Sequence, residues 1–140
     1  MHFEVPILLE NTINWFNRIS SLTTRQDIVM LENDAVVAMG GLTNIDQVLK
    51  KAELYIFVDP NIQGSGWGTK ATKLLCKYGF EDLNLQKIYL ETNEDNIKAQ
   101  RVYEKCDFVL EGRLRNEYLA PDGTYKSRFY YGLLKDEFHD

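Results

Sequence analysis

The segment LYIFVDPNIQGSGWGTKA, residues 54–71, decides the fold. Its first five residues are continuously apolar and end at Asp59-Pro60, as expected for a strand that is buried on both faces and stopped by proline. A glycine-rich stretch, residues 63–69, follows and opens an amphipathic helix. Glycine lets backbone N–H groups point outward without a Cβ in the way, and a helix N-terminus carries a positive dipole end. The segment is therefore predicted to cradle an anion such as phosphate.

Downstream, the pattern of apolar residues predicts a repeat of strand and helix. The first helix is expected to end near Gly79 or Leu83, because apolar residues recur at i, i+3, i+4 and i+7 before that point. A second central strand is predicted at Lys87–Thr92, and a second helix begins near Asn96. The apolar sides of the two helices, expected to face the core, are Ala71, Leu74, Leu75 and Tyr78 on the first, and Ala99, Val102, Tyr103 and Cys106 on the second.

Antiparallel hairpins are predicted on both sides of this unit. Upstream, the runs 28–31 and 35–39 are separated by residues that tolerate a tight turn. Downstream, residues 108–134 alternate in polarity and turn at Ala120-Pro121-Asp122-Gly123. Residues 10–22 have the periodicity of an amphipathic helix. The sequence thus predicts one α+β domain over residues 1–140, with a mixed, mostly antiparallel sheet and a central parallel pair.

Composition narrows the range of functions. The 140 residues include 16 basic and 21 acidic ones, a net charge of −5, which argues against a nucleic-acid or anionic-membrane partner. No apolar run reaches the ~20 residues of a membrane span and no signal peptide is apparent, so a cytoplasmic location is expected. Cys76 and Cys106 fit no zinc-ligand spacing and are expected to be buried, while His2 and His139 lie beside the chain ends. We therefore expect neither a metal nor a histidine-based triad.

Two other phosphate-binding motifs resemble the glycine-rich loop. A P-loop closes with Gly-Lys-Ser/Thr, but Gly68-Thr69-Lys70 has the opposite order, which disfavours nucleoside triphosphates. Gly66-x-Gly68-x-x-Ala71, with Glu91 following at the expected distance, imitates a dinucleotide fingerprint. In that fold, however, the glycines follow directly on the strand, and parallel units precede it. A dinucleotide-dependent oxidoreductase is therefore the less favoured alternative.

From about residue 10 to 134 the chain resembles the GNAT superfamily of acetyl-CoA-dependent N-acetyltransferases, especially the branch of ribosomal-protein and nucleotide-amino-sugar acetyltransferases. The family signature, Gln/Arg-x-x-Gly-x-Gly/Ala, is matched by Gln63, Gly66 and Gly68. A second element of the family is matched by Asn93-x-x-Asn96-x-x-Ala99-x-x-x-Tyr103-x-x-x-x-Phe108. The family usually has glycine before that phenylalanine; Asp107 stands here, and aspartate tolerates a left-handed helix terminus.

The resemblance implies a binding site for acetyl-CoA. The loop would hold the pyrophosphate, and the preceding strand would pair with the pantetheine arm as if it were an added strand. Asn96 can equally cap the second helix. Among the basic rows 70–77 and 98–105, Lys70, Lys98 and Lys105 are candidates to neutralise phosphate charge. The residues expected to bind acetyl-CoA are Ile56, Phe57, Val58, Gln63, Gly64, Ser65, Gly66, Trp67, Gly68, Thr69, Asn93, Asn96 and Lys98.

The resemblance also implies the catalytic pair. Related enzymes use a glutamate as general base and a tyrosine as general acid at the spacing of Glu91 and Tyr103. Glu53 and a water-mediated route are the rival bases. Transfer would be direct, without a cysteine nucleophile. The candidate walls of the acceptor site are residues 41–46 and the tyrosines Tyr118, Tyr125, Tyr130 and Tyr131.

The acceptor is expected to be a primary amine of a small molecule, such as a polyamine or a nucleotide-linked amino sugar, or a protein N-terminus. The alternative is a catalytically degenerate module that binds acetyl-CoA. Family members commonly begin with a further strand and helix, so the first strand is expected to be missing or displaced. The exposed sheet edge would then suit a homodimer.

Overall fold

The computed structural model describes residues 24–62, 64 and 66–140. The helix predicted at 10–22, and the question of a missing first strand, lie outside the described residues. The strands are β1 (Gln26–Glu32), β2 (Ala35–Asp46), β3 (Lys51–Val58), β4 (Lys87–Asn93), β5 (Val109–Leu119) and β6 (Tyr125–Leu134). The α-helices are α2 (Trp67–Lys77) and α3 (Ile97–Lys105), and short helical turns occupy Pro60–Ile62, Tyr78–Asp82 and Lys135–Glu137.

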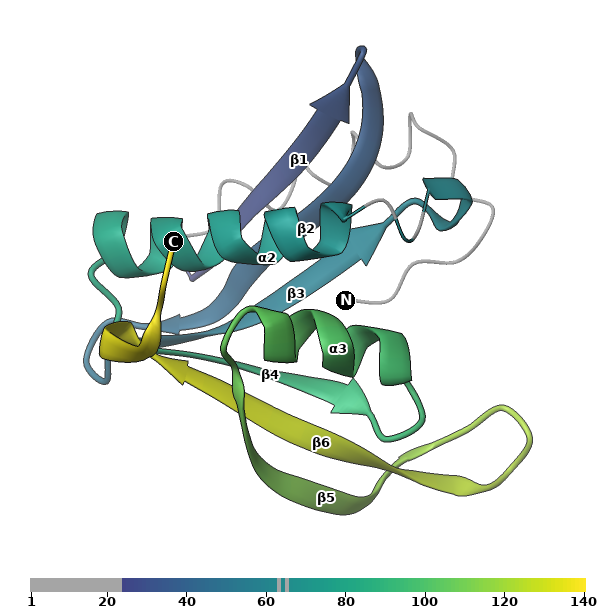
Figure 1. The fold of residues 1–140 in the computed structure, drawn as a ribbon. Coiled ribbons are helices and arrows are strands. Elements are labelled where there is room, and N and C mark those ends of the chain that lie inside the picture. Colours follow the sequence, from purple (N-terminus) through teal and green to yellow (C-terminus); the bar gives the residue numbers. More distant parts are fainter. Residues whose placement is uncertain (1–23, 63, 65) are drawn as a thin grey trace.

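The described strands form a single mixed sheet in the order β1-β2-β3-β4-β6-β5. β3 and β4 are parallel, and every other neighbouring pair is antiparallel. Both helices lie on one face of this sheet, with α2 over β2 and β3, and α3 beside β4 (Figure 1). The predicted α+β class with a central parallel pair is confirmed.

The hairpin turns form where the sequence predicts them. Between β1 and β2, Asn33 and Asp34 adopt φ values of 51° and 65°, in the left-handed region that these residue types tolerate. Between β5 and β6, Gly123 has φ 88°. β2 extends beyond the predicted run to Asp46, because it pairs with β1 on one side and β3 on the other.

The central parallel pair is short, and this is the feature that positions the site. Lys51–Glu53 pair with Lys87–Tyr89, and there the parallel pairing ends. From Leu54 onward β3 stays paired with β2 but no longer with β4, while β4 stays paired with β6 as far as Asn93. The two strands diverge from a common start, as Figure 1 shows. We call the opening between them the split.

Successive side chains of β3 and β4 point to opposite faces of the sheet. The helix face carries Ala52, Leu54, Ile56 and Val58 of β3 and Ile88, Leu90 and Thr92 of β4. The far face carries Lys51, Glu53 and Tyr55 of β3 and Tyr89, Glu91 and Asn93 of β4. The main hydrophobic core lies on the helix face and includes Leu75 of α2, Leu90 of β4 and Leu133 of β6.

The core faces of the helices differ in part from the prediction. Leu74 is 49% exposed, and the buried side of α2 is Ala71, Thr72, Leu75 and Cys76. The apolar stripe is thus shifted by one residue, because the helix begins at Trp67 and rests on β2 and β3. None of the residues of α3 from Ile97 to Lys105 is buried. Cys76 and Cys106 are both buried and unpaired, as predicted.

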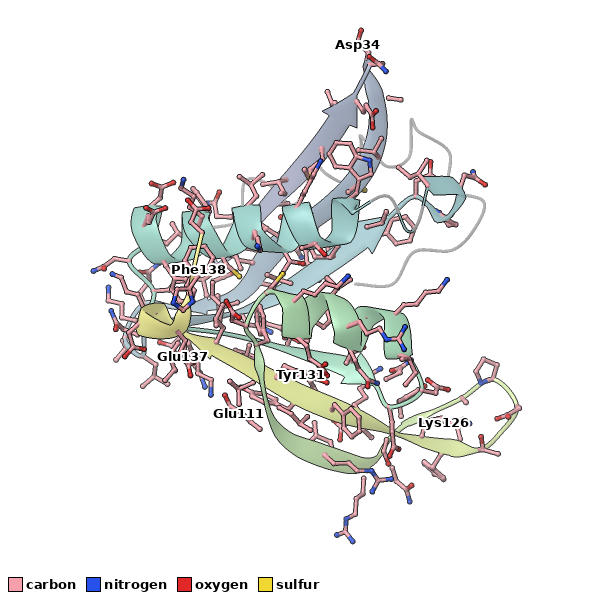
Figure 2. All side chains as sticks on the ribbon, viewed as in Figure 1. Asp34, Glu111, Lys126, Tyr131, Glu137 and Phe138 are labelled. Atoms are coloured by element: carbon pink, nitrogen blue, oxygen red, sulfur yellow. The ribbon has the colours of Figure 1, made fainter. Side chains whose placement is uncertain are left out.

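The segment after α2 is wound more widely than an α-helix. Residues Tyr78–Asp82 form a π-helical turn, so the regular helix ends at Lys77, before the predicted Gly79. Gly79 is required there, because a Cβ would approach the side chain of Ile88 to 2.8 Å. Phe138, labelled in Figure 2, returns from the end of β6 and packs on Phe80 with ring centroids 5.5 Å apart. This contact closes the core at the C-terminal end of α2.

Candidate active site

A pocket of about 340 Å³ opens on the helix face beside the split. Its walls come from the diverging end of β3, from the N-terminus of α2 and from the inner side of α3, which explains why α3 contributes no buried residue. The lining residues are Ile56, Val58, Gly64, Gly66, Trp67, Gly68, Thr69, Thr72, Asn96, Lys98, Ala99, Val102, Tyr103 and Lys105.

The N-terminus of α2 forms one end of this pocket. Gly66 is the N-cap and has φ +90°, a left-handed conformation that glycine adopts without strain. It has no side chain to cap the helix, so the first N–H groups of α2 are left for another acceptor. Because the helix dipole adds positive potential at the same place, this end can bind a phosphate group.

Positive side chains stand close to that terminus. Lys98 and Lys105 of α3 line the pocket, and the ammonium of Lys70 lies 4.9 Å from the centroid of the Trp67 ring. A chain with a net charge of −5 thus has a local basic surface at this pocket. Such a surface attracts a polyanionic ligand despite the overall charge.

Most residues predicted to bind acetyl-CoA lie together in this pocket. Phe57 and Asn93 do not line it, and Gln63 and Ser65 lie outside the described residues. Asn96 combines the two roles considered for it, because its Oδ1 accepts from the Ala99 N–H at 3.2 Å while the residue also lines the pocket. Asp107 has φ 69°, the left-handed conformation expected after the second helix.

Tyr103 of α3 lines the pocket. Its ring packs against Phe108 and Tyr131, with centroid distances of 5.9 and 6.3 Å. Burial raises the pKa of Tyr103 to about 12, so its hydroxyl stays protonated at neutral pH. A protonated phenol in this position can donate a proton to a ligand in the pocket.

Glu91 occupies the far face of β4, across the sheet from Tyr103. Its Oε1 is buried and has no hydrogen-bond partner among the described residues. Burial raises the pKa of Glu91, the nearby carboxylates of Glu53 and Glu117 raise it further, and Arg128 opposes them. A carboxylate with a raised pKa is suited to accept a proton near neutral pH.

Glu53 stands on the same face at the point where the split begins. It is paired in register with Tyr89, the last residue of β4 that pairs with β3. The Asn44 Nδ2 donates to Glu53 Oε1 at 2.9 Å, which fixes the direction of this carboxylate. Both candidate bases therefore lie at the opening of the split on the far face, with Tyr103 on the helix face.

The four tyrosines predicted to wall the acceptor site occupy different environments. Tyr130 stacks on Tyr89 with ring centroids 5.4 Å apart, and Tyr118 lies under the guanidinium of Arg128 at 4.6 Å. Tyr125 is 64% exposed at the start of β6.

Tyr131 belongs instead to the core: it points from β6 toward α3, where its hydroxyl donates to Glu104 at 3.4 Å (Figure 2). The prediction that Tyr131 forms a wall of the acceptor site is therefore wrong, because Tyr131 lies on the helix face of β6.

Sequence reasoning missed a buried charge network on the far face. Asp27 of β1 accepts from Tyr55 of β3 at 2.5 Å and pairs with Arg25 at 2.9 Å. Gly41 lies between them on β2, and a Cβ there would approach both Asp27 and Tyr55 to 2.8 Å. The sequence signal was the Gly40-Gly41 pair inside an apolar strand, which indicates close approach of neighbouring groups.

The model of the acetyltransferase (GNAT) family matches residues 4–108, and the chain belongs to this family. It is 41% identical over 97 residues to spermidine N(1)-acetyltransferase of Escherichia coli K12, covering 69% of this chain and 52% of that protein. It is 33% identical over 109 residues to the putative ribosomal N-acetyltransferase YdaF of Bacillus subtilis, covering 78% and 59%.

Solved structures agree with the family. The chain superimposes on the spermidine N-acetyltransferase of Vibrio cholerae in complex with CoA and spermine with a TM-score of 0.83. The two are 26% identical, and the match covers 96% of this chain and 80% of that one. The chain spans 52% and 59% of the length of the two curated relatives above. Proteins of the family use acetyl-CoA as donor.

Residues 24–62, 64 and 66–140 contain neither a cluster of metal ligands nor a helix that could span a membrane. No group of three or more histidine, cysteine or acidic side chains in that part of the chain is arranged to hold a metal ion. No helix in it is long and apolar enough to cross a membrane.

The glycines of the loop yield a prediction that separates binding from folding. A Cβ on Gly68 would meet Val102 and Val58 at 3.7–3.8 Å, ordinary contact distances, so the fold accommodates Gly68→Ala. The added methyl would nevertheless occupy the pocket beside the α2 N-terminus. We expect the Kd for coenzyme A to rise about tenfold, roughly 1.4 kcal/mol, with little change in Tm. Calorimetric titration checks this, with Gly112→Ala, in open space on β5, as the control.

Proposed function

We propose that the chain is an acetyl-CoA-dependent N-acetyltransferase that transfers the acetyl group directly to a primary amine. The observation that carries the proposal is the split. The two strands part between a pocket suited to a phosphorylated donor, on the helix face, and a pair of carboxylates on the far face. Donor and acceptor can therefore approach the same point from opposite sides of the sheet.

In this proposal the donor occupies the pocket. The N–H groups at the start of α2 and the ammonium groups of Lys98 and Lys105 would hold its phosphates. The edge of β3 that leaves β4, at Ile56–Val58, would pair with the amide groups of the pantetheine arm. This arrangement directs the thioester along the split toward Tyr103.

The chemical step needs a base and an acid. Glu91 would accept a proton from the acceptor ammonium, directly or through water, leaving a neutral amine. The amine nitrogen then forms a bond to the thioester carbonyl carbon, and the carbon–sulfur bond breaks as the tetrahedral intermediate collapses. Tyr103 would donate its proton to the departing thiolate, and the proton that the nitrogen loses on forming the amide restores the phenol. The products are an N-acetylated amine and free coenzyme A.

For the acceptor we propose a polyamine. Glu53 and Glu117 lie close enough to Glu91 to raise its pKa electrostatically, so the three carboxylates form an acidic cluster. Such a cluster favours a ligand with several positive charges, because complementary potentials steer and orient binding. Relatives named for spermidine support the same choice, although the similarity to a putative ribosomal acetyltransferase keeps a protein N-terminus as a second acceptor to test.

The test has a binding arm and a turnover arm. Acetyl-CoA at 100 times its Kd should stabilise the protein by about 2.7 kcal/mol, a rise in Tm of several degrees, whereas NADH should give none. Release of free thiol from acetyl-CoA is then measured with spermidine and with a peptide that has a free N-terminus. Turnover with spermidine supports the proposal. Binding of acetyl-CoA without thiol release from either amine would identify a degenerate binding module instead.

A further inference from the structure

The guanidinium of Arg128 stands near the carboxylates of Glu91, Glu53 and Glu117. Arg128 lies on β6 directly opposite Asn93 of β4, and Tyr130 lies opposite Glu91. Arg128 and Glu91 are therefore diagonal neighbours on the same face, a relation that places Cβ atoms about 7–8 Å apart. That distance is short enough for a long side chain to reach across.

The guanidinium is nevertheless held elsewhere. Its Nε donates to Asn93 Oδ1 at 3.3 Å, and its Cζ lies 4.6 Å from the centroid of the Tyr118 ring. None of the ion pairs within the described residues joins Arg128 to Glu91, and Glu91 Oε1 has no hydrogen-bond partner. Asn93 and Tyr118 thus clamp the cation beside the carboxylate without letting it pair.

Two neighbouring carboxylates disfavour the charge of Glu91. Glu53 on β3 and Glu117 on β5 are like charges, and Tyr89 and Tyr130 contribute neutral phenols whose own pKa values are raised. Among the described residues, Arg128 is the one group that lowers the pKa of Glu91. Its position therefore decides how much of this repulsion is offset.

We propose that Arg128 is a positioning residue of the acceptor site, clamped by Asn93 and Tyr118 so that its positive charge acts on the Glu91 carboxylate without occupying it. An ion pair would block the oxygen that must accept a proton and would repel a cationic amine. Complete removal of the charge would raise the pKa of Glu91 further, so that less of this carboxyl group would be ionised at a given pH. The clamp holds Glu91 between these two states. The inference rests on the proposed function for its catalytic meaning.

The experiment follows the carboxyl carbon of Glu91 by NMR titration of the ligand-free protein labelled with ¹³C-glutamate. In Arg128→Gln the titration midpoint should rise by about 0.5 to 1 unit, and Arg128→Lys should restore most of the difference. In Asn93→Ala the released guanidinium should reach the carboxylate, so the midpoint should fall. Arg113→Gln is the matched control, because Arg113 is paired with Glu94 at 2.8 Å and should leave the midpoint unchanged.

The opposite signs of the two shifts distinguish the clamp from a general loss of structure, and Tm values with amide spectra verify that each variant is folded. An unchanged midpoint in either Arg128→Gln or Asn93→Ala would overturn the proposal. The acidic limb of kcat/KM for acetyl-CoA and spermidine should move in the same directions. If the wild-type chain transfers no acetyl group, the proposed function fails while the titration still tests Arg128, so the two failures remain distinguishable.

Discussion

Replacing Tyr103 by phenylalanine is expected to lower kcat by a factor of about 10² to 10⁴, the range in which general acid catalysis contributes. The hydroxyl that is lost is the proton donor for the thiolate in the proposed mechanism. The ring remains, together with its contacts to Phe108 and Tyr131, so the fold and the affinity for acetyl-CoA should change little. Steady-state kinetics with saturating acetyl-CoA, combined with calorimetric titration of coenzyme A, measures both quantities.

The matched control is Tyr131→Phe. This tyrosine belongs to the same ring cluster and also loses one hydroxyl, but that hydroxyl donates to the exposed Glu104 and does not line the pocket. Its kcat should stay within about twofold of the wild type. A Tyr103→Phe variant as active as this control would show that the thiolate leaves without help from Tyr103.

The second large effect is expected for Glu91→Gln. Glutamine has nearly the same shape but accepts no proton, so kcat/KM for the amine should fall by about 10² to 10⁴. If Glu53 is the base, the loss will be under tenfold and Glu53→Gln will show the larger decrease. If a water chain without either carboxylate is the base, both losses will be under tenfold. Measuring both variants across pH 6 to 9 decides between the candidates.

The same substitution should stabilise the protein. The pKa of Glu91 is raised in the folded state, so the folded protein binds a proton more readily there than the unfolded chain does. The stability associated with this group is therefore present below its unfolded pKa, near 4.3, and is lost as the pH rises through the folded pKa. Glutamine does not ionise, so the Glu91→Gln variant does not lose this stability as the pH rises. Its Tm should exceed that of the wild type at pH 7.5, and the difference should shrink toward pH 4.

Local patterns predicted the elements of this fold well. The turns at Asn33-Asp34 and Gly123, the strand that ends before Pro60, and the Asn96 cap all depend on interactions within a few residues. The rotation of α2, which exposes Leu74, depends on how the helix rests on the sheet. The π-helical turn contains Gly79, where a Cβ would meet Ile88 on another element. Neither contact is encoded in the periodicity of one segment.

The residues of the site likewise fall into those that a short motif predicted and those that only the fold brings together. The glycine loop and Tyr103 belong to short motifs, and the structure gathers nearly all of the described motif residues around one pocket. The far face is assembled from strands that are distant in sequence, so no spacing relates Glu91 to Glu117 or Arg128. Asn93 illustrates the limit. Its motif suggested a contact with the coenzyme, whereas its Oδ1 accepts from Arg128 on the other side of the sheet.

The split has a consequence for how such a protein can diversify. On β3 and β4 the even-numbered residues, such as Ile56 and Leu90, face the helices, and the odd-numbered ones, such as Glu53 and Glu91, face the opposite side. Alternate residues of one strand therefore belong to two different surfaces of the sheet. Substitutions at odd positions can change the choice of amine while the even positions, and with them the donor pocket, are inherited intact.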